Sequence, residues 1–110
     1  MIKITNPKSV EPHTPFMIEC NVSSHTQPIS VAWYQSNQLI NLSRQKYRTN
    51  WFHINESYIR HVLYIDGFPL ASMRESQEID FMCGATSFHG TQFAGTSILL
   101  RSINIHFFLL

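Results

Sequence analysis

Hydrophobic residues occupy every second position in several short stretches of this 110-residue chain. The clearest stretch covers residues 16–22, where the apolar positions are Phe16, Ile18, Cys20 and Val22. Successive side chains of a β-strand point to opposite faces, so this alternation predicts a strand with one buried face. No stretch keeps the period of an amphipathic helix over about twelve residues. The pattern therefore predicts an all-β fold.

Further stretches rich in β-branched and aromatic residues follow at intervals of roughly ten residues, with turn residues between them. We expect strands over residues 29–35, 39–40, 58–65, 79–83 and 91–101, with a hairpin turn at His89 and Gly90. Residues 41–57 show weak periodicity, and we expect only one or two short edge strands and a loop there. Residues 70–75 are expected to form a single helical turn. Many short strands without a long helix predict a sandwich of two sheets.

Composition narrows the class of protein. Apolar residues make up 44% of the chain and aromatic residues 13%, so the chain can bury enough surface to fold. Its length predicts one domain with a single modest core. The 8 lysines and arginines against 7 aspartates and glutamates leave a formal net charge of +1. A chain so nearly neutral has no bulk attraction for a phosphate backbone, and we expect no nucleic-acid partner.

Cys20 and Cys83 are the only cysteines, and they lie far apart in the sequence. Two thiols can complete a metal site with histidines, act as a redox pair, stay buried and reduced, or form one disulfide. The redox spacing Cys-x-x-Cys is absent, and the six histidines include no pair at a spacing that would hold one metal ion. We therefore expect no metal and no cofactor, and the cysteines alone leave buried thiols and a disulfide open.

Trp33 adds a third residue to this arrangement, because Cys20, Trp33 and Cys83 each fall on the predicted inner side of their own strand. The arrangement resembles the immunoglobulin fold, in which a tryptophan packs on a disulfide that joins the two sheets. The resemblance implies a disulfide between Cys20 and Cys83, which would contribute about 4 kcal/mol by restricting the unfolded chain. The predicted core contains Trp33, Phe81, Leu63 and Ile65.

Two positions near the second cysteine depart from the common immunoglobulin pattern. Phe81 stands where many such domains have a tyrosine whose hydroxyl bonds to the backbone, and Gln77 replaces a common aspartate. Together with the short segment between Ile40 and Tyr58, they favour the intermediate or constant-2 type of sandwich over the variable type. We expect an N-terminal linker or first edge strand, an immunoglobulin-like domain and an apolar tail, at residues 1–13, 14–101 and 102–110.

Several segments are similar to the interleukin-1 receptor family, namely residues 16–22, 31–34, 55–59, 62–65, 79–84 and 87–90. They resemble the membrane-proximal immunoglobulin domain of these receptors, or the lone domain of the single-immunoglobulin member. In this family Phe-x-Cys is common at the second cysteine, as at Phe81 and Cys83 here. The resemblance implies a receptor ectodomain module that helps to bind an interleukin-1-type cytokine or a co-receptor. It also implies a parent protein anchored in a membrane.

Three Asn-x-Ser sequons occur, at Asn21, Asn41 and Asn55, and each falls on a predicted outward position or loop. Charged residues are only 14% of the chain, against about 25% in typical soluble domains, and N-glycans would keep such a surface soluble. Sequons and a disulfide together predict an extracellular location. The alternative is three unused tripeptides in an intracellular chain. Residues 1–5 lack the apolar run of a signal peptide, so we expect a fragment of a longer receptor.

No sequence motif supports catalysis, because the chain has no nucleophile elbow, paired-carboxylate motif or phosphate-binding glycine loop. We therefore expect a binding module and not an enzyme. Exposed aromatic residues often anchor protein partners, and the candidates are Tyr34, Tyr47, Trp51 and Phe52. The alternative for Trp51 and Phe52 is packing on an edge strand of the domain's own core. A cell-adhesion module with homophilic or heterophilic contacts is the alternative function.

Overall fold

The structure is a computed structural model of the chain, and it describes residues 2–23, 30–43, 45–55, 57–69 and 76–101. The predicted helical turn at residues 70–75 and the apolar tail at 102–110 lie outside these ranges. All nine regular elements of the described residues are β-strands, and they form two sheets that pack face to face. The predicted all-β sandwich is confirmed.

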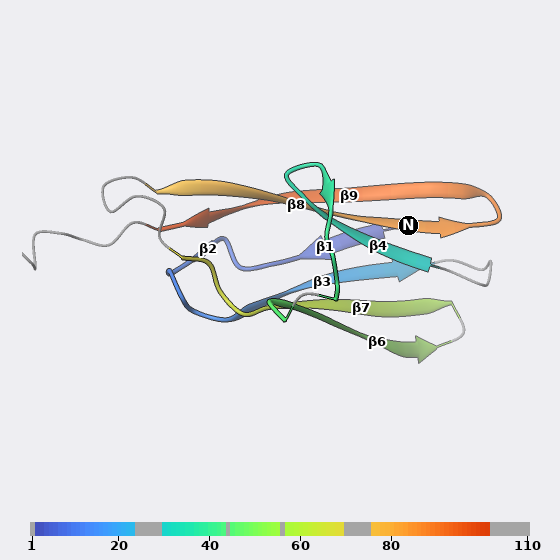
Figure 1. The fold of residues 1–110 in the computed structure, drawn as a ribbon. Helices are drawn as coiled ribbons and strands as arrows, with labels where there is room; N and C mark the ends of the chain where they lie inside the picture. Colours follow the sequence, from blue (N-terminus) through green and yellow to red (C-terminus); the bar gives the residue numbers. More distant parts are fainter. Residues whose placement is uncertain (1, 24–29, 44, 56, 70–75, 102–110) are drawn as a thin grey trace, which may run out of the picture.

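Sheet A has four strands in the order β1 (Ile2–Thr5), β3 (Phe16–Ser23), β7 (Tyr58–Ile65) and β6 (Tyr47–Asn55). Sheet B has five strands in the order β2 (Ser9–Val10), β9 (Gly90–Leu100), β8 (Gln77–Ser87), β4 (Ser30–Gln35) and β5 (Gln38–Leu39). Neighbouring strands are antiparallel, except that β2 runs parallel to β9. Figure 1 shows the two layers, with β8 and β9 in one and β3, β7 and β6 in the other.

The core lies between the sheets and is centred on a disulfide. Cys20 of β3 and Cys83 of β8 are bonded, with their Cα atoms 6.5 Å apart, so the bridge ties sheet A to sheet B. Trp33 of β4 is the cross-strand partner of Cys83, and all three side chains are buried. Leu63 and Ile65 of β7 are buried in the same cluster. This arrangement is an immunoglobulin-like sandwich of the intermediate or constant-2 type.

Phe81 is buried two residues before the second cysteine. Its ring packs against those of Phe16 and Phe68, with centroids 6.3 and 6.2 Å away. Phe16 lies in β3 and Phe68 follows β7, so the three rings close one end of the core. Aromatic packing thus occupies the place that a hydrogen-bonding tyrosine has in many immunoglobulin domains.

Two tight hairpins shape sheet B. Ser36 and Asn37 join β4 to β5 with φ values of 50° and 65°, the pair of left-handed residues that a type I′ turn needs. The predicted turn between β8 and β9 is also present, with Phe88 and His89 at its tip and Gly90 at φ 112°. The second hairpin pairs eleven residues on each strand, so β8 and β9 form the long central ribbon of sheet B.

The expectation of only short edge strands in residues 41–57 is wrong. β6 is nine residues long and pairs with β7 from Tyr47 to Asn55, with a bulge between His53 and Asn55. Eight of its nine residues are exposed, so no buried face imposes a hydrophobic alternation on the sequence. Backbone pairing with β7 therefore holds a strand that the residue pattern does not reveal.

The N-terminal segment contributes an edge strand to each sheet. β1 pairs with β3 in sheet A, and β2 pairs with β9 in sheet B. Pro7 lies between them, where it donates no backbone hydrogen bond. Among the described residues, no helix is long and apolar enough to cross a membrane.

Candidate binding face on the five-stranded sheet

The four predicted binding aromatics do not form one surface. Tyr34 is half-buried on the outer side of sheet B, opposite Met82. Tyr47 packs against the core at the start of β6, and its hydroxyl donates a hydrogen bond of 2.6 Å to Oε1 of Gln35. The remaining two candidates, Trp51 and Phe52, are considered next.

Trp51 and Phe52 are consecutive in β6 and therefore point to opposite sides of sheet A. Both are exposed, so neither is packed into the core. Trp51 meets the ring of His53 edge-on at 4.8 Å, whereas Phe52 lies opposite Arg60 on the outer side of the sheet. These two side chains cannot contact one flat partner surface together.

The outward side of sheet B, which we call the sheet B face, carries a cluster of apolar side chains together with polar ones such as Asp80 and Ser97. The strand registers place Phe93 opposite Gly84, and Tyr34 opposite both Leu39 and Met82. A Cβ atom on Gly84 would lie only 2.8 Å from the Phe93 ring, so the glycine is what lets this ring lie across the sheet. There the ring meets Tyr34 edge-on, at a centroid distance of 6.2 Å.

Large apolar side chains on the sheet B face reach solvent. Leu39 is 66% exposed and Phe93 is 55% exposed, and Leu99 is exposed near the other end. The five strands of sheet B contain no lysine, arginine or histidine. Their only charged residues are Glu78 and Asp80, so the face is apolar with a net negative charge.

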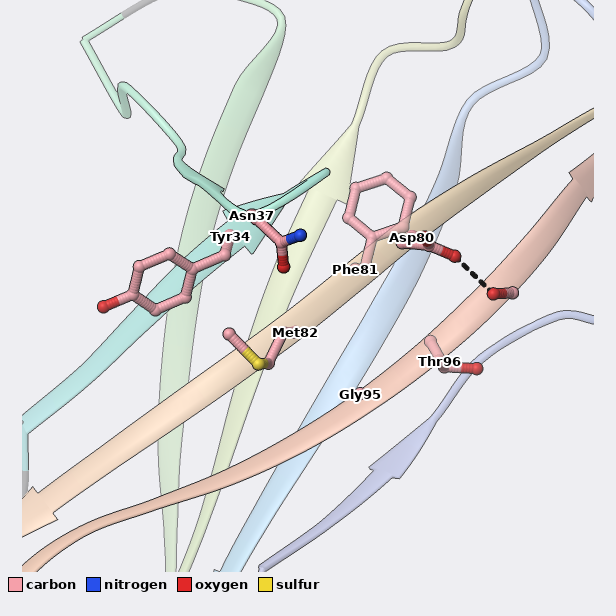
Figure 2. A pocket seen from close by; sticks show the side chains of 8 residues that line it. Tyr34, Asn37, Asp80, Phe81, Met82, Gly95 and Thr96 are labelled. Atoms are coloured by element: carbon pink, nitrogen blue, oxygen red, sulfur yellow. Dashed lines mark hydrogen bonds between the residues drawn. The ribbon is translucent and has the colours of Figure 1, made fainter.

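A hollow of about 330 Å³ opens on the sheet B face (Figure 2). Gly95 contributes no side chain and leaves this space beside Tyr34 and Met82. The Ser36 N–H donates a hydrogen bond of 2.9 Å to the Asp80 carbonyl oxygen, which fixes the β4–β5 turn against β8. The residues that line the hollow are Tyr34, Asn37, Asp80, Phe81, Met82, Gly95, Thr96 and Ser97.

The Asp80 carboxylate is the charged group of this hollow. Its Oδ1 accepts a hydrogen bond from the Ser97 hydroxyl of β9, as the dashed line in Figure 2 shows. The two ion pairs among the described residues join Arg60 to Glu19 and Arg101 to Glu11, and neither involves Asp80. The carboxylate is therefore an exposed anion without a counter-charge from the described part of the chain.

The outward side of sheet A, which we call the sheet A face, has the opposite sign. Its strands carry Lys3, Arg48 and Arg60 against one carboxylate, that of Glu19. Asn21 lies near the centre of this face, in register with Lys3 on one side and Arg60 on the other. Its Oδ1 atom is buried and has no hydrogen-bond partner among the described residues.

The three sequon asparagines lie away from the central strands of sheet B. Asn21 is half-buried on the sheet A face, and Asn55 is exposed at the end of β6. Asn41 is exposed in the connection that leaves β5 for β6, where its Oδ1 accepts a hydrogen bond of 3.0 Å from the Ser43 N–H. Strands β4, β8 and β9 contain no sequon. Glycans on these asparagines would leave β4, β8 and β9 bare, whereas a glycan on Asn41 would lie beside Leu39 at the β5 edge.

His61 of β7 lies beside the core tryptophan. The Trp33 Nε1–H donates a hydrogen bond of 3.1 Å to Nδ1 of His61, and the two ring centroids are 6.2 Å apart. Burial penalises the imidazolium and lowers the pKa of His61 below its usual value of 6.5. Within the described residues, no three His, Cys, Asp or Glu side chains gather as a metal site would require.

Sequence reasoning missed most of this surface. Phe93, Asp80 and Asn37 come from three separate parts of the chain, and only the strand register brings them together. A signal was present in Gly84 and Gly95, because a glycine inside a strand often marks a close approach or an open space.

A comparison of the chain with protein-family models and with curated proteins finds no match. The fold and its two outer faces are therefore the observations that bear on function.

Proposed function

We propose that this chain is a non-catalytic, extracellular immunoglobulin-like module that binds a protein partner through the sheet B face. One observation carries the proposal: the sheet B face exposes a cluster of large apolar side chains, and its central strands β4, β8 and β9 contain no sequon. Aromatic anchors such as Phe93 and Tyr34 concentrate binding energy in protein interfaces. A bare apolar face on an otherwise glycosylated domain is where such a partner would dock.

The extracellular location is supported by the disulfide together with the sequons. A disulfide that joins two sheets persists in oxidising compartments and is rare in the cytosol. Asn41 and Asn55 are exposed, so a glycan on either side chain would meet no packed core. Both features belong to a protein that passes through the secretory route.

The finer proposal is a module of an interleukin-1-type receptor, whose partner is a cytokine of that class or a co-receptor. Its support is the resemblance of the strand segments around Cys20, Trp33 and Cys83, together with the fold. Adhesion between copies is the second candidate function. It is favoured by the opposite charges of the sheet A face and the sheet B face, which would attract each other in a head-to-tail contact.

Two matched variants test which face binds. Phe93 on sheet B and Phe52 on sheet A are both exposed phenylalanines, at 55% and 42%. The glycosylated chain and its variants Phe93→Ala and Phe52→Ala are titrated on a biosensor against interleukin-1-type cytokines, co-receptor ectodomains and the chain itself. We expect Phe93→Ala to weaken binding by about tenfold or more, because it removes an aromatic anchor. Phe52→Ala should leave the affinity within about twofold.

Three outcomes contradict the proposal or part of it. Equal losses in both variants, or a larger loss in Phe52→Ala, would contradict the assignment of the sheet B face. Binding to the chain itself alone would replace the receptor proposal with adhesion. No binding to any of these probes would contradict the receptor and adhesion proposals together. Thermal unfolding of both variants shows whether each remains folded.

A further inference from the structure

Strand β9 has a long backbone edge that no other described strand covers. β2 pairs only with Leu99 and Leu100, and the Leu99 N–H donates a hydrogen bond of 3.0 Å to the Lys8 carbonyl oxygen. β1 comes near β9 but pairs with β3 in the other sheet. Backbone groups alternate in direction along a strand, so every second residue before Leu99 also points its N–H and C=O away from β8. These residues are Thr91, Phe93, Gly95 and Ser97, and all four are exposed.

This uncovered edge of residues 91–97, which we call the β9 edge, lacks the features that keep strand edges from pairing with another chain. Natural edges are blunted by charged side chains, proline, bulges or very short strands. β9 has eleven residues, none of them charged and none of them proline. The free edge of β6 differs, because that strand carries Arg48 and ends in the sequon at Asn55. In β6 the Asn50 side chain also accepts a hydrogen bond of 2.9 Å from the Trp51 N–H.

The β9 edge fits an antiparallel copy of itself. A twofold axis beside Ala94 pairs Thr91 with Ser97 of the second copy, and Phe93 with Gly95 of the second copy. All four outward residues of each copy then form hydrogen-bonded pairs, and each pair exchanges two backbone hydrogen bonds. The large Phe93 ring lies next to a residue without a side chain, a pairing that suits strand glycines. No pair brings together two like charges or two large side chains.

We propose that two copies of this chain pair along the β9 edge and form a closed dimer, in which one sheet runs through both copies. The dimer goes beyond the proposed function, because it leaves the sheet B face of each copy open to a different protein. Asp80 does not oppose this contact. It lies opposite Ser97, so the two Asp80 carboxylates would be six residues apart along the strands, about 20 Å, where salt screens their repulsion.

Sedimentation of the full-length, glycosylated and disulfide-bonded chain measures its self-association without any partner protein. We expect a reversible dimer at about 100 μM protein, because an edge contact buries less surface than the interfaces of stable complexes. The assembly should stop at two copies, since a twofold contact is closed. A head-to-tail contact between the sheet A face and the sheet B face would instead add further copies as the concentration rises.

Two variants that each add one cysteine test the strand register. Thr91→Cys and Ser97→Cys are mixed and mildly oxidised. In the proposed dimer these two positions lie opposite each other with Cα atoms about 5.5 Å apart, which is within reach of a disulfide. Either variant alone places its two added cysteines about 20 Å apart. We expect the mixture to form cross-linked dimers at least about fivefold faster than either variant alone.

A proline at position 95 tests whether backbone hydrogen bonds hold the dimer. The Gly95 N–H points away from β8, so Gly95→Pro removes no hydrogen bond within the chain. Gly95→Ala keeps the N–H, and its Cβ meets only the Phe81 carbonyl oxygen, at 3.6 Å. We expect Gly95→Pro to weaken the dimer by about tenfold or more and Gly95→Ala by less than about threefold. Circular dichroism and thermal unfolding verify that each variant is folded.

Three results would overturn the β9 dimer. They are a monomer at about 100 μM protein, which would leave the edge to a strand of another protein, equal cross-linking by the mixture and by a single variant, and equal weakening by Gly95→Pro and Gly95→Ala. These experiments use no cytokine or co-receptor, so their outcome is separate from that of the biosensor titration. A β9 dimer that binds no other protein would contradict the receptor proposal alone. Partner binding by a chain that stays monomeric would contradict the β9 dimer alone.

Discussion

The two outer faces of this sandwich are built on the same strand alternation and carry charges of opposite sign. The sheet A face carries Lys3, Arg48 and Arg60 with a sequon at Asn21 near its centre. The sheet B face carries exposed apolar side chains, two carboxylates, and no sequon on β4, β8 or β9. Under the proposed function, sheet A would supply solubility through charge and a glycan, and sheet B would supply recognition.

The comparison teaches that exposure alone does not identify a binding surface. Trp51 and Phe52 are exposed on an edge strand, but they point to opposite sides of it and are followed by the sequon at Asn55. Phe93 and Tyr34 are exposed or half-buried on one side of one sheet, and their rings touch. Contiguity on a bare face is what distinguishes the second pair.

The largest expected change in stability comes from removing the disulfide that joins the two sheets. Replacing both cysteines, as Cys20→Ala with Cys83→Ala, removes the one disulfide that joins sheet A to sheet B. We expect the free energy of unfolding to fall by about 4 kcal/mol, because the unfolded chain regains the entropy of the open loop. Urea unfolding of the two proteins measures the difference. A loss below about 1 kcal/mol would show that the faces are held in place without the bridge.

The second prediction concerns the pH dependence of stability. The strands of sheet A contain histidines, and those of sheet B contain none. The folded-state pKa of His61 is lowered by burial, so the unfolded chain binds its proton first as the pH falls. Stability is therefore constant above the unfolded value of 6.5 and decreases as the pH falls from there towards the lowered folded value.

A glutamine at this position tests the pH dependence directly. His61→Gln keeps an amide oxygen that can accept the hydrogen bond from Trp33 Nε1–H, but it does not titrate. The urea concentration at the midpoint of unfolding should decrease as the pH is lowered from 7.5 to 5. The decrease should be smaller for His61→Gln than for the unaltered chain. The same decrease in both proteins would assign the pH dependence to groups other than His61.

The smallest effect on stability concerns the sheet B face itself. In Gly84→Ala the new Cβ would lie 2.8 Å from the Phe93 ring, so this exposed ring must swing off Tyr34. We expect the free energy of unfolding to change by less than about 1 kcal/mol, because the loss of ring contact is offset by the better strand propensity of alanine. Nuclear Overhauser contacts between the two rings should disappear, and their persistence would contradict the role given to Gly84.

The sequence was most informative where one face of a strand is buried. Hydrophobic alternation in residues 16–22 predicts β3, because its even-numbered side chains from Phe16 to Val22 point into the core. The immunoglobulin resemblance of Cys20, Trp33 and Cys83 then implied the bridge that the structure contains. These predictions succeed because burial imposes a repeating pattern on the amino acids.

The rest could not be predicted because it depends on register and on exposed backbone pairing. β6 is exposed along nearly its whole length, so its residues carry no alternation that predicts a long strand. The hollow exists because the register sets Gly95 opposite Met82, and because the Ser36 N–H ties the β4–β5 turn to Asp80. Neither pairing follows from the local sequence around these residues.

A glycan placed on the sheet B face tests the central claim most directly. Gly95→Asn creates a sequon with Thr96 and Ser97, and a Cβ at this position meets only the Phe81 carbonyl oxygen, at an ordinary 3.6 Å. Gly95→Gln provides a side chain of similar chemistry without a glycan. Asn21→Gln, which removes the natural sequon from the sheet A face, is the control for the opposite side.

The measurement is the biosensor affinity for the interleukin-1-type cytokine or co-receptor that binds the unaltered chain, after mass spectrometry has verified glycan occupancy. We predict that glycosylated Gly95→Asn loses about a hundredfold or more in affinity, while Gly95→Gln loses less and Asn21→Gln stays within about twofold. Retained binding with the new glycan in place, or a loss on removing the Asn21 sequon, would contradict recognition through sheet B.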